Sequence, residues 1–150
     1  MTDLILACLH HVIAFSMAAV LAFEVALTRP GIAAGDIRRL IITDRHYGVM
    51  ALLLLVIGFA RAIWAAKGWD YYSVNAMFWA KMATFLAIAL LSARPTLAII
   101  AWRRASLADA GFSPDPSHIQ AVRRLLYAQA ALFVLLPLFA AAMARGYGQF

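Results

Sequence analysis

The chain has 150 residues, of which 65% are hydrophobic and 13% are charged. Soluble domains contain roughly 45–50% apolar residues, so this composition excludes a water-soluble globular protein and indicates one that is solvated by lipid. The net charge is +6, but the basic residues lie between long apolar segments, which excludes a nucleic-acid-binding domain with one basic face. The single cysteine, Cys8, excludes an intrachain disulfide.

Four segments are long and apolar enough to cross the hydrocarbon core, which takes roughly 20 residues of helix. The first is predicted over about residues 4–27 and is followed by a breaker at 29–31. The others are predicted over about residues 46–66, 77–102 and 122–144. Backbone groups in lipid must be satisfied within their own segment, so the expected fold is all-α. It is an integral membrane four-helix bundle that forms a single domain over residues 1–150.

Three residues refine these helices. Pro95 and Pro137 are predicted to kink the third and fourth helices, since neighbouring groups in a membrane bundle can satisfy the backbone that a proline frees. Ser117 is predicted to cap a short cytoplasmic extension of the fourth helix.

The distribution of lysine and arginine predicts the topology. The loops after the first and third helices hold four arginines each: Arg29, Arg38, Arg39 and Arg45, then Arg103, Arg104, Arg123 and Arg124. The other side holds Lys67 and Arg145, joined by Arg61 and Lys81 if these extend outward. The positive-inside rule therefore places both loops in the cytoplasm and both termini outside, an N-out/C-out arrangement. We expect a multi-pass protein of the bacterial inner membrane, with the lipid bilayer as its surroundings.

Four basic side chains are predicted to converge in the outer half of the bundle. His10 and His11 lie about two turns into the first helix, Arg61 about one turn below the outer end of the second, and Lys81 about one turn into the third. Consecutive helices with short loops are antiparallel neighbours, so the four residues share a depth. Ionisable groups at membrane depth mark functional sites. In the alternative interpretation, Arg61 and Lys81 extend to the headgroups and the histidines bond to neighbouring helices.

Such a cluster suits an anionic cofactor, and haem b fits it, because an imidazole can ligate the iron while Arg and Lys pair with the propionates. His10 is the expected metal ligand, and His11, Arg61 and Lys81 complete the predicted cofactor-binding residues. Consecutive residues point about 100° apart around a helix, so both histidines cannot ligate one iron. Which of the two faces the interior is left open, as is the sixth ligand.

A second polar group is predicted at the inner end of the bundle. Its members are Glu24, Arg45 and His46, with Asp44, Arg94, Tyr127 and Gln129 at a similar level. One interpretation is a charge-paired network that braces the helices near the interface. The other is an entry path for protons or substrate from the cytoplasm, with Glu24 and His46 as relays.

The order of these features resembles known membrane proteins. The chain carries histidines in LHHVIAFSMAAVLAFEVAL, RRL before the second helix, a lysine in FWAKMATFLAIALL and a basic entry in RRLLYAQAALFVLLPLF. It resembles an uncharacterised family of small four-helix bacterial membrane proteins, and is distantly similar to HemJ-type protoporphyrinogen oxidases and CopD-like membrane domains. The HemJ likeness implies a haem b-binding bundle that oxidises a tetrapyrrole, with His10 or His11 and a catalytic Lys81 as essential residues. The chain departs from that pattern at Trp79, where HemJ-type proteins usually carry a second histidine.

The leading hypothesis is a HemJ-like, haem b-binding membrane protein with a redox or electron-transfer role, an oxidoreductase if the likeness extends to activity. Its substrate would be a tetrapyrrole or a quinone-like molecule. The main alternative is a non-enzymatic subunit or transporter-like module that packs against a larger complex or forms a homodimer. A third hypothesis is copper handling, suggested by the CopD likeness and by His10, His11 and Met17.

Overall fold

The computed structural model describes residues 1–64 and 67–150. The helices of this part of the chain are α1 (Thr2–Leu27), α2 (Ala34–Trp64), α3 (Gly68–Ser73), α4 (Ala76–Ala108) and α5 (Pro116–Ala144). All but the short α3 are long and apolar enough to cross a membrane. No strand occurs among the described residues, apart from one isolated bridge between Asn75 and Gln149. The predicted all-α membrane bundle is therefore confirmed.

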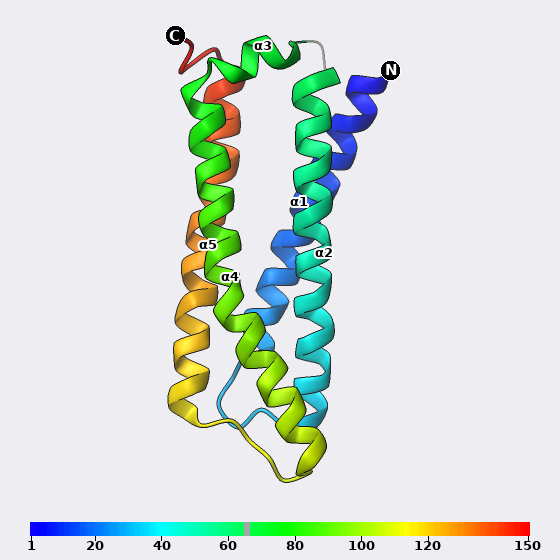
Figure 1. Ribbon diagram of the computed structural model, residues 1–150, viewed down its shortest axis with the longest axis vertical. Coiled ribbons are helices and arrows are strands. Elements are labelled where there is room, and N and C mark those ends of the chain that lie inside the picture. Colours follow the sequence, from blue (N-terminus) through cyan, green and yellow to red (C-terminus); the bar gives the residue numbers. More distant parts are fainter. Residues whose placement is uncertain (65–66) are drawn as a thin grey trace.

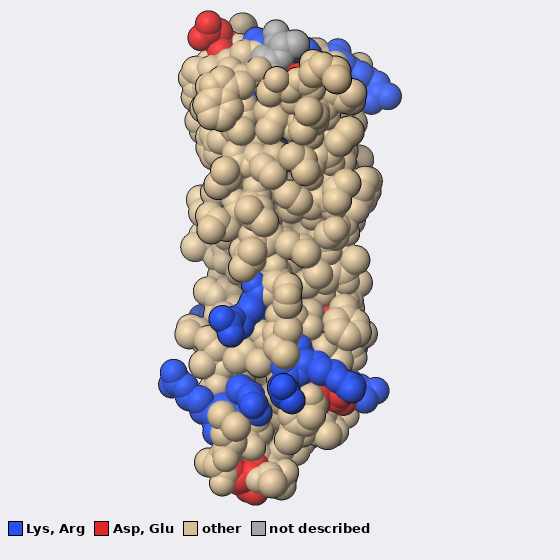
Figure 2. Space-filling view, turned by 90° about the vertical axis from the view of Figure 1, so that its right-hand side faces the viewer, with Lys and Arg blue, Asp and Glu red and all other residues tan. Residues whose placement is uncertain are grey.

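The four long helices form a ring in which α1 packs beside α2, α2 beside α4, α4 beside α5, and α5 beside α1. Both termini and α3 lie at one end of this ring, and the loops after α1 and α4 lie at the other (Figure 1). Arginine and lysine side chains form a band near the end opposite the termini, and an apolar stretch separates this band from the other end (Figure 2). The positive-inside rule predicts that the end with the termini is the outer one, and the two ends are called outer and cytoplasmic on that basis.

Three helices extend further at the cytoplasmic end than the apolar segments predicted. Helix α2 begins at Ala34 rather than about residue 46, and α4 continues to Ala108. Helix α5 begins at Pro116, so the short cytoplasmic extension predicted ahead of residue 122 is present. The extensions remain helical because apolar side chains recur at helical spacing, as buried Ile37 and Leu40 do on α2. Averaging hydropathy along the sequence detects only the part of each helix that crosses the lipid, and it does not detect the more polar extension. The predicted end of the second helix at residue 66 lies outside the described residues.

Two local predictions need correction. Asp115, not Ser117, caps α5: its carboxylate accepts a hydrogen bond from the Ser117 backbone N–H at 2.7 Å, and Pro116 takes the first helical position. The loop after α2 also contains the short helix α3, which lies across the outer end of the bundle (Figure 1). Pro95 and Pro137 lie inside α4 and α5 as expected, and α4 bends along its length (Figure 1).

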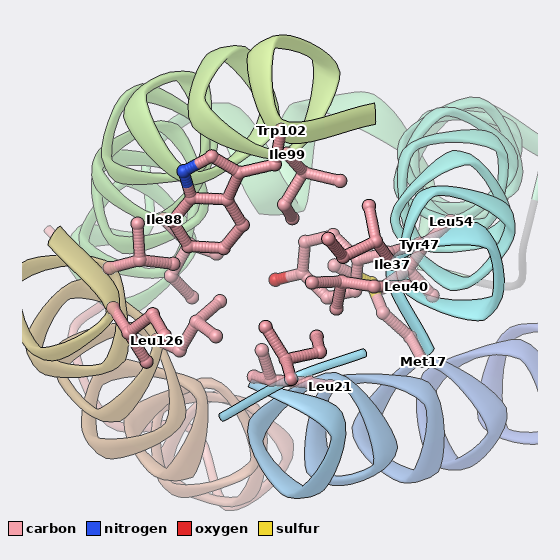
Figure 3. Packing of buried hydrophobic residues seen from close by; sticks show 13 residues of the cluster. Met17, Leu21, Ile37, Leu40, Tyr47, Leu54, Ile88, Ile99, Trp102 and Leu126 are labelled. Carbon is pink, nitrogen blue, oxygen red and sulfur yellow. The ribbon is translucent and has the colours of Figure 1, made fainter. Parts of the chain in front are cut away.

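The core lies along the axis of the ring, and each long helix contributes to it (Figure 3). The labelled residues are Met17, Leu21, Ile37, Leu40, Tyr47, Leu54, Ile88, Ile99, Trp102 and Leu126. Lipid tails are as apolar as these side chains, so the hydrophobic effect does not drive the helices together. The core stabilises the bundle through close packing, which fixes how each helix is rotated about its own axis.

Asn75 closes the outer end of the bundle. It is fully buried, and its Oδ1 accepts hydrogen bonds from the backbone N–H groups of Met77 (2.9 Å) and Phe78 (3.1 Å), which caps α4. Its Nδ2 donates to the Tyr147 carbonyl at 3.1 Å. One side chain thus joins the start of α4 to the C-terminal segment.

Asn75→Ala is expected to lower the free energy of unfolding by about 1–2 kcal/mol, because the cap is lost and buried backbone groups lose their partners. The measurement is thermal unfolding in detergent. Asn75→Ser is the matched control, because serine still caps a helix but has no amide to donate to Tyr147. An Ala variant as stable as the wild type would contradict the role assigned to Asn75.

Candidate functional site

His10 is the histidine that faces the bundle interior. Its ring is half-buried, and Nδ1 has no hydrogen-bond partner among the described residues. It packs against Gly58 of α2, where an added Cβ would lie 3.3 Å from the His10 Cε1 atom. His11 is exposed, and its Nδ1 donates to the Ala7 carbonyl of its own helix at 2.6 Å. The two rings meet edge to face, with their centroids 6.1 Å apart.

Two adjoining cavities open beside His10. The deep cavity has a volume of about 410 Å³ and is mainly apolar, with Leu54, Phe85 and Phe133 among its lining residues. The rim cavity, of about 340 Å³, includes Arg61 and Lys67 in its lining. The residues shared by both cavities are His10, His11, Gly58, Phe78, Lys81, Ala140 and Ala144. Side chains from all four long helices therefore surround one two-part space in the outer half.

All four residues predicted to converge at the outer end line this space: His10, His11 and Lys81 border both parts, and Arg61 borders the rim cavity. The Nε atom of Arg61 is buried and has no hydrogen-bond partner in residues 1–64 and 67–150. Within the same residues, the only ion pairs join Asp36 to Arg29 and Arg39 at the cytoplasmic end. The cations of the outer site are thus available to an anion.

Lys67 adds a further cation at the outer rim. Its Nζ lies 4.1 Å from the centroid of the Tyr71 ring. The neighbouring Lys67 is the main cause of a lowered pKa at Tyr71, which lies outside the membrane-spanning segments. The Tyr71 hydroxyl donates to the Met143 carbonyl at 3.0 Å. This contact holds α3 over the end of α5 and places Lys67 beside the mouth of the rim cavity.

The structure does not bring the three residues of the predicted inner network together. Glu24 is 1% exposed and faces the bundle interior, whereas Arg45 and His46 are exposed. The Nδ1 atom of His46 donates to the Ile42 carbonyl of its own helix at 2.7 Å. Because Asp44 and Tyr47 turn inward, the two positions between them on α2 must turn outward. Arg94 and Tyr127 are also exposed.

A different polar cluster occupies the interior near the cytoplasmic end. Its members are Glu24 on α1, Asp44 and Tyr47 on α2, Thr96 on α4 and Gln129 on α5. The Thr96 hydroxyl donates to Asp44 Oδ1 at 2.7 Å. The Tyr47 hydroxyl, which points toward the bundle axis (Figure 3), is buried and has no partner in the described part of the chain. The side-chain Nε2 and Oε1 atoms of Gln129 are also buried and have no hydrogen-bond partner among the described residues.

Sequence reasoning missed Tyr47 and Thr96 as members of this interior cluster. Tyr47 follows Asp44 by three positions, a spacing that places both on one face of a helix. That spacing was a usable signal for Tyr47. The sequence carried no comparable signal for Thr96, because the hydroxyl of a threonine in a membrane helix commonly donates a hydrogen bond to a carbonyl of its own helix.

Comparison with known proteins places the chain in a family. A family model described as "Predicted membrane protein (DUF2214)" matches residues 2–148. The chain belongs to this family. No curated protein and no solved structure matches it. The match agrees with the expected uncharacterised membrane family, and nothing in these comparisons supports the likeness to HemJ-type or CopD-like proteins.

The geometry of this DUF2214 member suits one class of ligand. An apolar body would lie in the deep cavity, and anionic groups would lie among the cations of the rim cavity. The deep cavity falls within the roughly 300–1,000 Å³ range of small-molecule pockets. Among the described residues, no three His, Cys, Asp or Glu side chains gather to hold a metal ion.

Proposed function

We propose that this membrane protein binds haem b in its outer cavities and has a redox or electron-transfer role. One observation carries the proposal: the unpartnered Nδ1 of His10 is buried at the border of an apolar cavity whose outer rim is cationic. A buried polar atom without a partner is costly unless a ligand satisfies it. An imidazole beside an apolar space, with unpaired cations above it, matches the iron, the macrocycle and the propionates of haem.

Each residue has a definite part in this proposal. His10 would ligate the iron, Arg61 and Lys81 would pair with the propionates, and His11 would border the mouth of the site. Gly58 keeps the space beside the His10 ring free of a side chain. When bound, haem supplies one-electron chemistry, which the side chains of the chain lack.

A finer part of the proposal concerns catalysis. The apolar deep cavity suits a tetrapyrrole or a quinone-like substrate, and Lys81 borders both cavities, where its ammonium group could transfer a proton to or from a bound molecule. In such an oxidoreductase Lys81 would be the catalytic residue. The band of arginines at one end supports placement in the bacterial inner membrane, with the haem site in the outer leaflet (Figure 2).

Absorption spectra of the purified protein test the proposal directly. After expression with ample haem, the oxidised and reduced wild type is expected to show a Soret band and its redox shift. His10→Ala is expected to lose this band or to show a shifted one, because the iron loses its axial ligand. His11→Ala is the matched control and is expected to keep the wild-type spectrum, since that ring is exposed and bonds to its own helix.

One result would overturn the proposal, and another would change the residue assigned as the ligand. A folded wild-type protein without a Soret band would show that the cavities serve another purpose. If that protein also copurified with a stoichiometric partner protein, the non-enzymatic subunit would become the better account. A wild-type spectrum retained in His10→Ala but lost in His11→Ala would reverse the assignment of the ligand.

A further inference from the structure

Two carboxyl groups lie inside the bundle without a basic partner. Glu24 is 1% exposed and Asp44 is 7% exposed, and they are close enough for their charges to interact. The described residues contain no ion pair to either of them. Neither residue lines the outer cavities, so this pair is a separate feature of the molecule.

Gln129 lies at the same level as Glu24. Arg123 of α5 donates a hydrogen bond to the Thr28 carbonyl, which aligns the start of α5 with the end of α1. Gln129 lies six positions beyond Arg123, about 9 Å along α5, and Glu24 lies four positions before Thr28, about 6 Å along α1. The two helices are adjacent and antiparallel, and both side chains are 1% exposed, so both point into the interior.

The donors and acceptors of Gln129 indicate whether the Glu24 carboxyl is protonated or ionised. Both amide atoms of Gln129 lack a partner within residues 1–64 and 67–150, so Nε2 needs an acceptor and Oε1 needs a donor. An ionised carboxylate offers acceptors only, whereas a protonated carboxyl offers one of each. An ionised, unpaired carboxylate would also be costly at this depth. We propose that Glu24 and Asp44 form a proton-binding site in the bundle interior, with Glu24 as the protonated group.

The charged and titratable groups around Glu24 are consistent with this site. From α2, Asp44 and Tyr47 face it, and the next residue of the chain after Asp44, Arg45, is exposed. From α5, Arg123 is directed to the Thr28 carbonyl and to the Tyr127 hydroxyl. From α4, Thr96 donates to Asp44, and Arg94 is exposed. No described cation is therefore aimed at the pair, and Glu24 lies within one turn of the cytoplasmic end of α1.

Labelling with an apolar carbodiimide tests the proposal on the wild-type protein in detergent. In this reaction the carboxyl proton moves to a carbodiimide nitrogen while the carboxyl oxygen bonds to the carbodiimide carbon. The reagent therefore modifies protonated carboxyls in apolar surroundings. Peptide mass spectrometry is expected to find Glu24 modified at neutral pH, with modification falling as the pH is raised and the proton is lost. Asp36, which is partly buried and paired with Arg29 and Arg39, is the internal control and should remain unmodified, because its ion pairs keep it ionised.

Variants and added cations separate the outcomes. Glu24→Gln should lose the modified peptide, and Asp44→Asn should alter the pH at which Glu24 is modified, because the neighbouring carboxyl has been neutralised. Protection of Glu24 by sodium but not by potassium would overturn the proposal in favour of a metal-ion site. An unmodified Glu24 in wild-type protein at neutral pH would also overturn it. None of these measurements needs haem, so their failure is distinct from failure of the proposed cofactor.

Discussion

Replacing Gly58 with leucine is expected to abolish ligand binding in the outer cavities while the bundle still folds. Gly58 borders both cavities, and a Cβ at this position already lies 3.3 Å from His10 Cε1. The rest of a leucine side chain would displace the ring or fill the adjoining space. Overpacking of this kind costs about 1–3 kcal/mol, and each 1.4 kcal/mol weakens binding about tenfold. Loss of the iron ligand would weaken it further.

The measurement is titration of the purified protein with haem, followed by the absorption of the bound form. Gly48→Leu is the matched control, since Gly48 is an exposed glycine of the same helix where an added Cβ meets no atom within 4 Å. Leucine is favourable in a membrane helix, so both variants should elute like the wild type in gel filtration. Wild-type haem affinity in a folded Gly58→Leu variant would show that the ligand does not occupy these cavities.

Neutralising the cations of the site is expected to weaken haem binding without removing the axial ligand. Hydrogen bonds to charged groups contribute about 1.5–3 kcal/mol each, so Arg61→Met and Lys81→Met should each weaken affinity about 10- to 100-fold. Both side chains border the rim cavity, and methionine retains much of their apolar length. The Soret position should stay that of the wild type, because His10 is untouched.

Two controls show whether charge is the cause. Arg145→Met removes an exposed cation from the same end of the molecule that lines neither cavity, and it should leave affinity unchanged. Haem with both propionates esterified has no anionic groups, so the wild type and the two variants should bind it alike. An equal loss of affinity for the esterified haem would show that Arg61 and Lys81 act through packing rather than through charge.

Hydropathy and charge predicted most of the fold, because both are local properties that can be read from a window of neighbouring residues in the sequence. Each long helix covers the described part of one predicted apolar segment, and the arginine band lies at the predicted end. The cytoplasmic extensions of α2 and α4 were underestimated, since the stability of such an extension comes from one buried face, such as Ile37 and Leu40 on α2, rather than from overall apolarity. Helix α3 was missed because six residues carry too little periodicity to stand out.

The outer site was within reach of sequence reasoning because depth in a membrane follows from position along a helix. Residues 10, 61 and 81 are distant in the chain, yet each lies a countable number of turns from the outer end, so their convergence could be predicted. The membership of the inner cluster could not be predicted as well from the sequence. Its assembly depends on which way each side chain points, and Arg45 and His46 point away from Glu24 although they share its level.

The linear chain thus determines how many times the protein crosses the membrane, in which direction, and which polar residues share a depth. These properties follow from local hydropathy, charge and the rise of the helix. The rotation of each helix about its axis comes from side-chain packing between neighbours. That rotation turns His10 inward and His11 outward, and it gathers Glu24, Asp44 and Gln129 around the interior. No single segment contains this information, because each rotation depends on the shapes of the helices beside it.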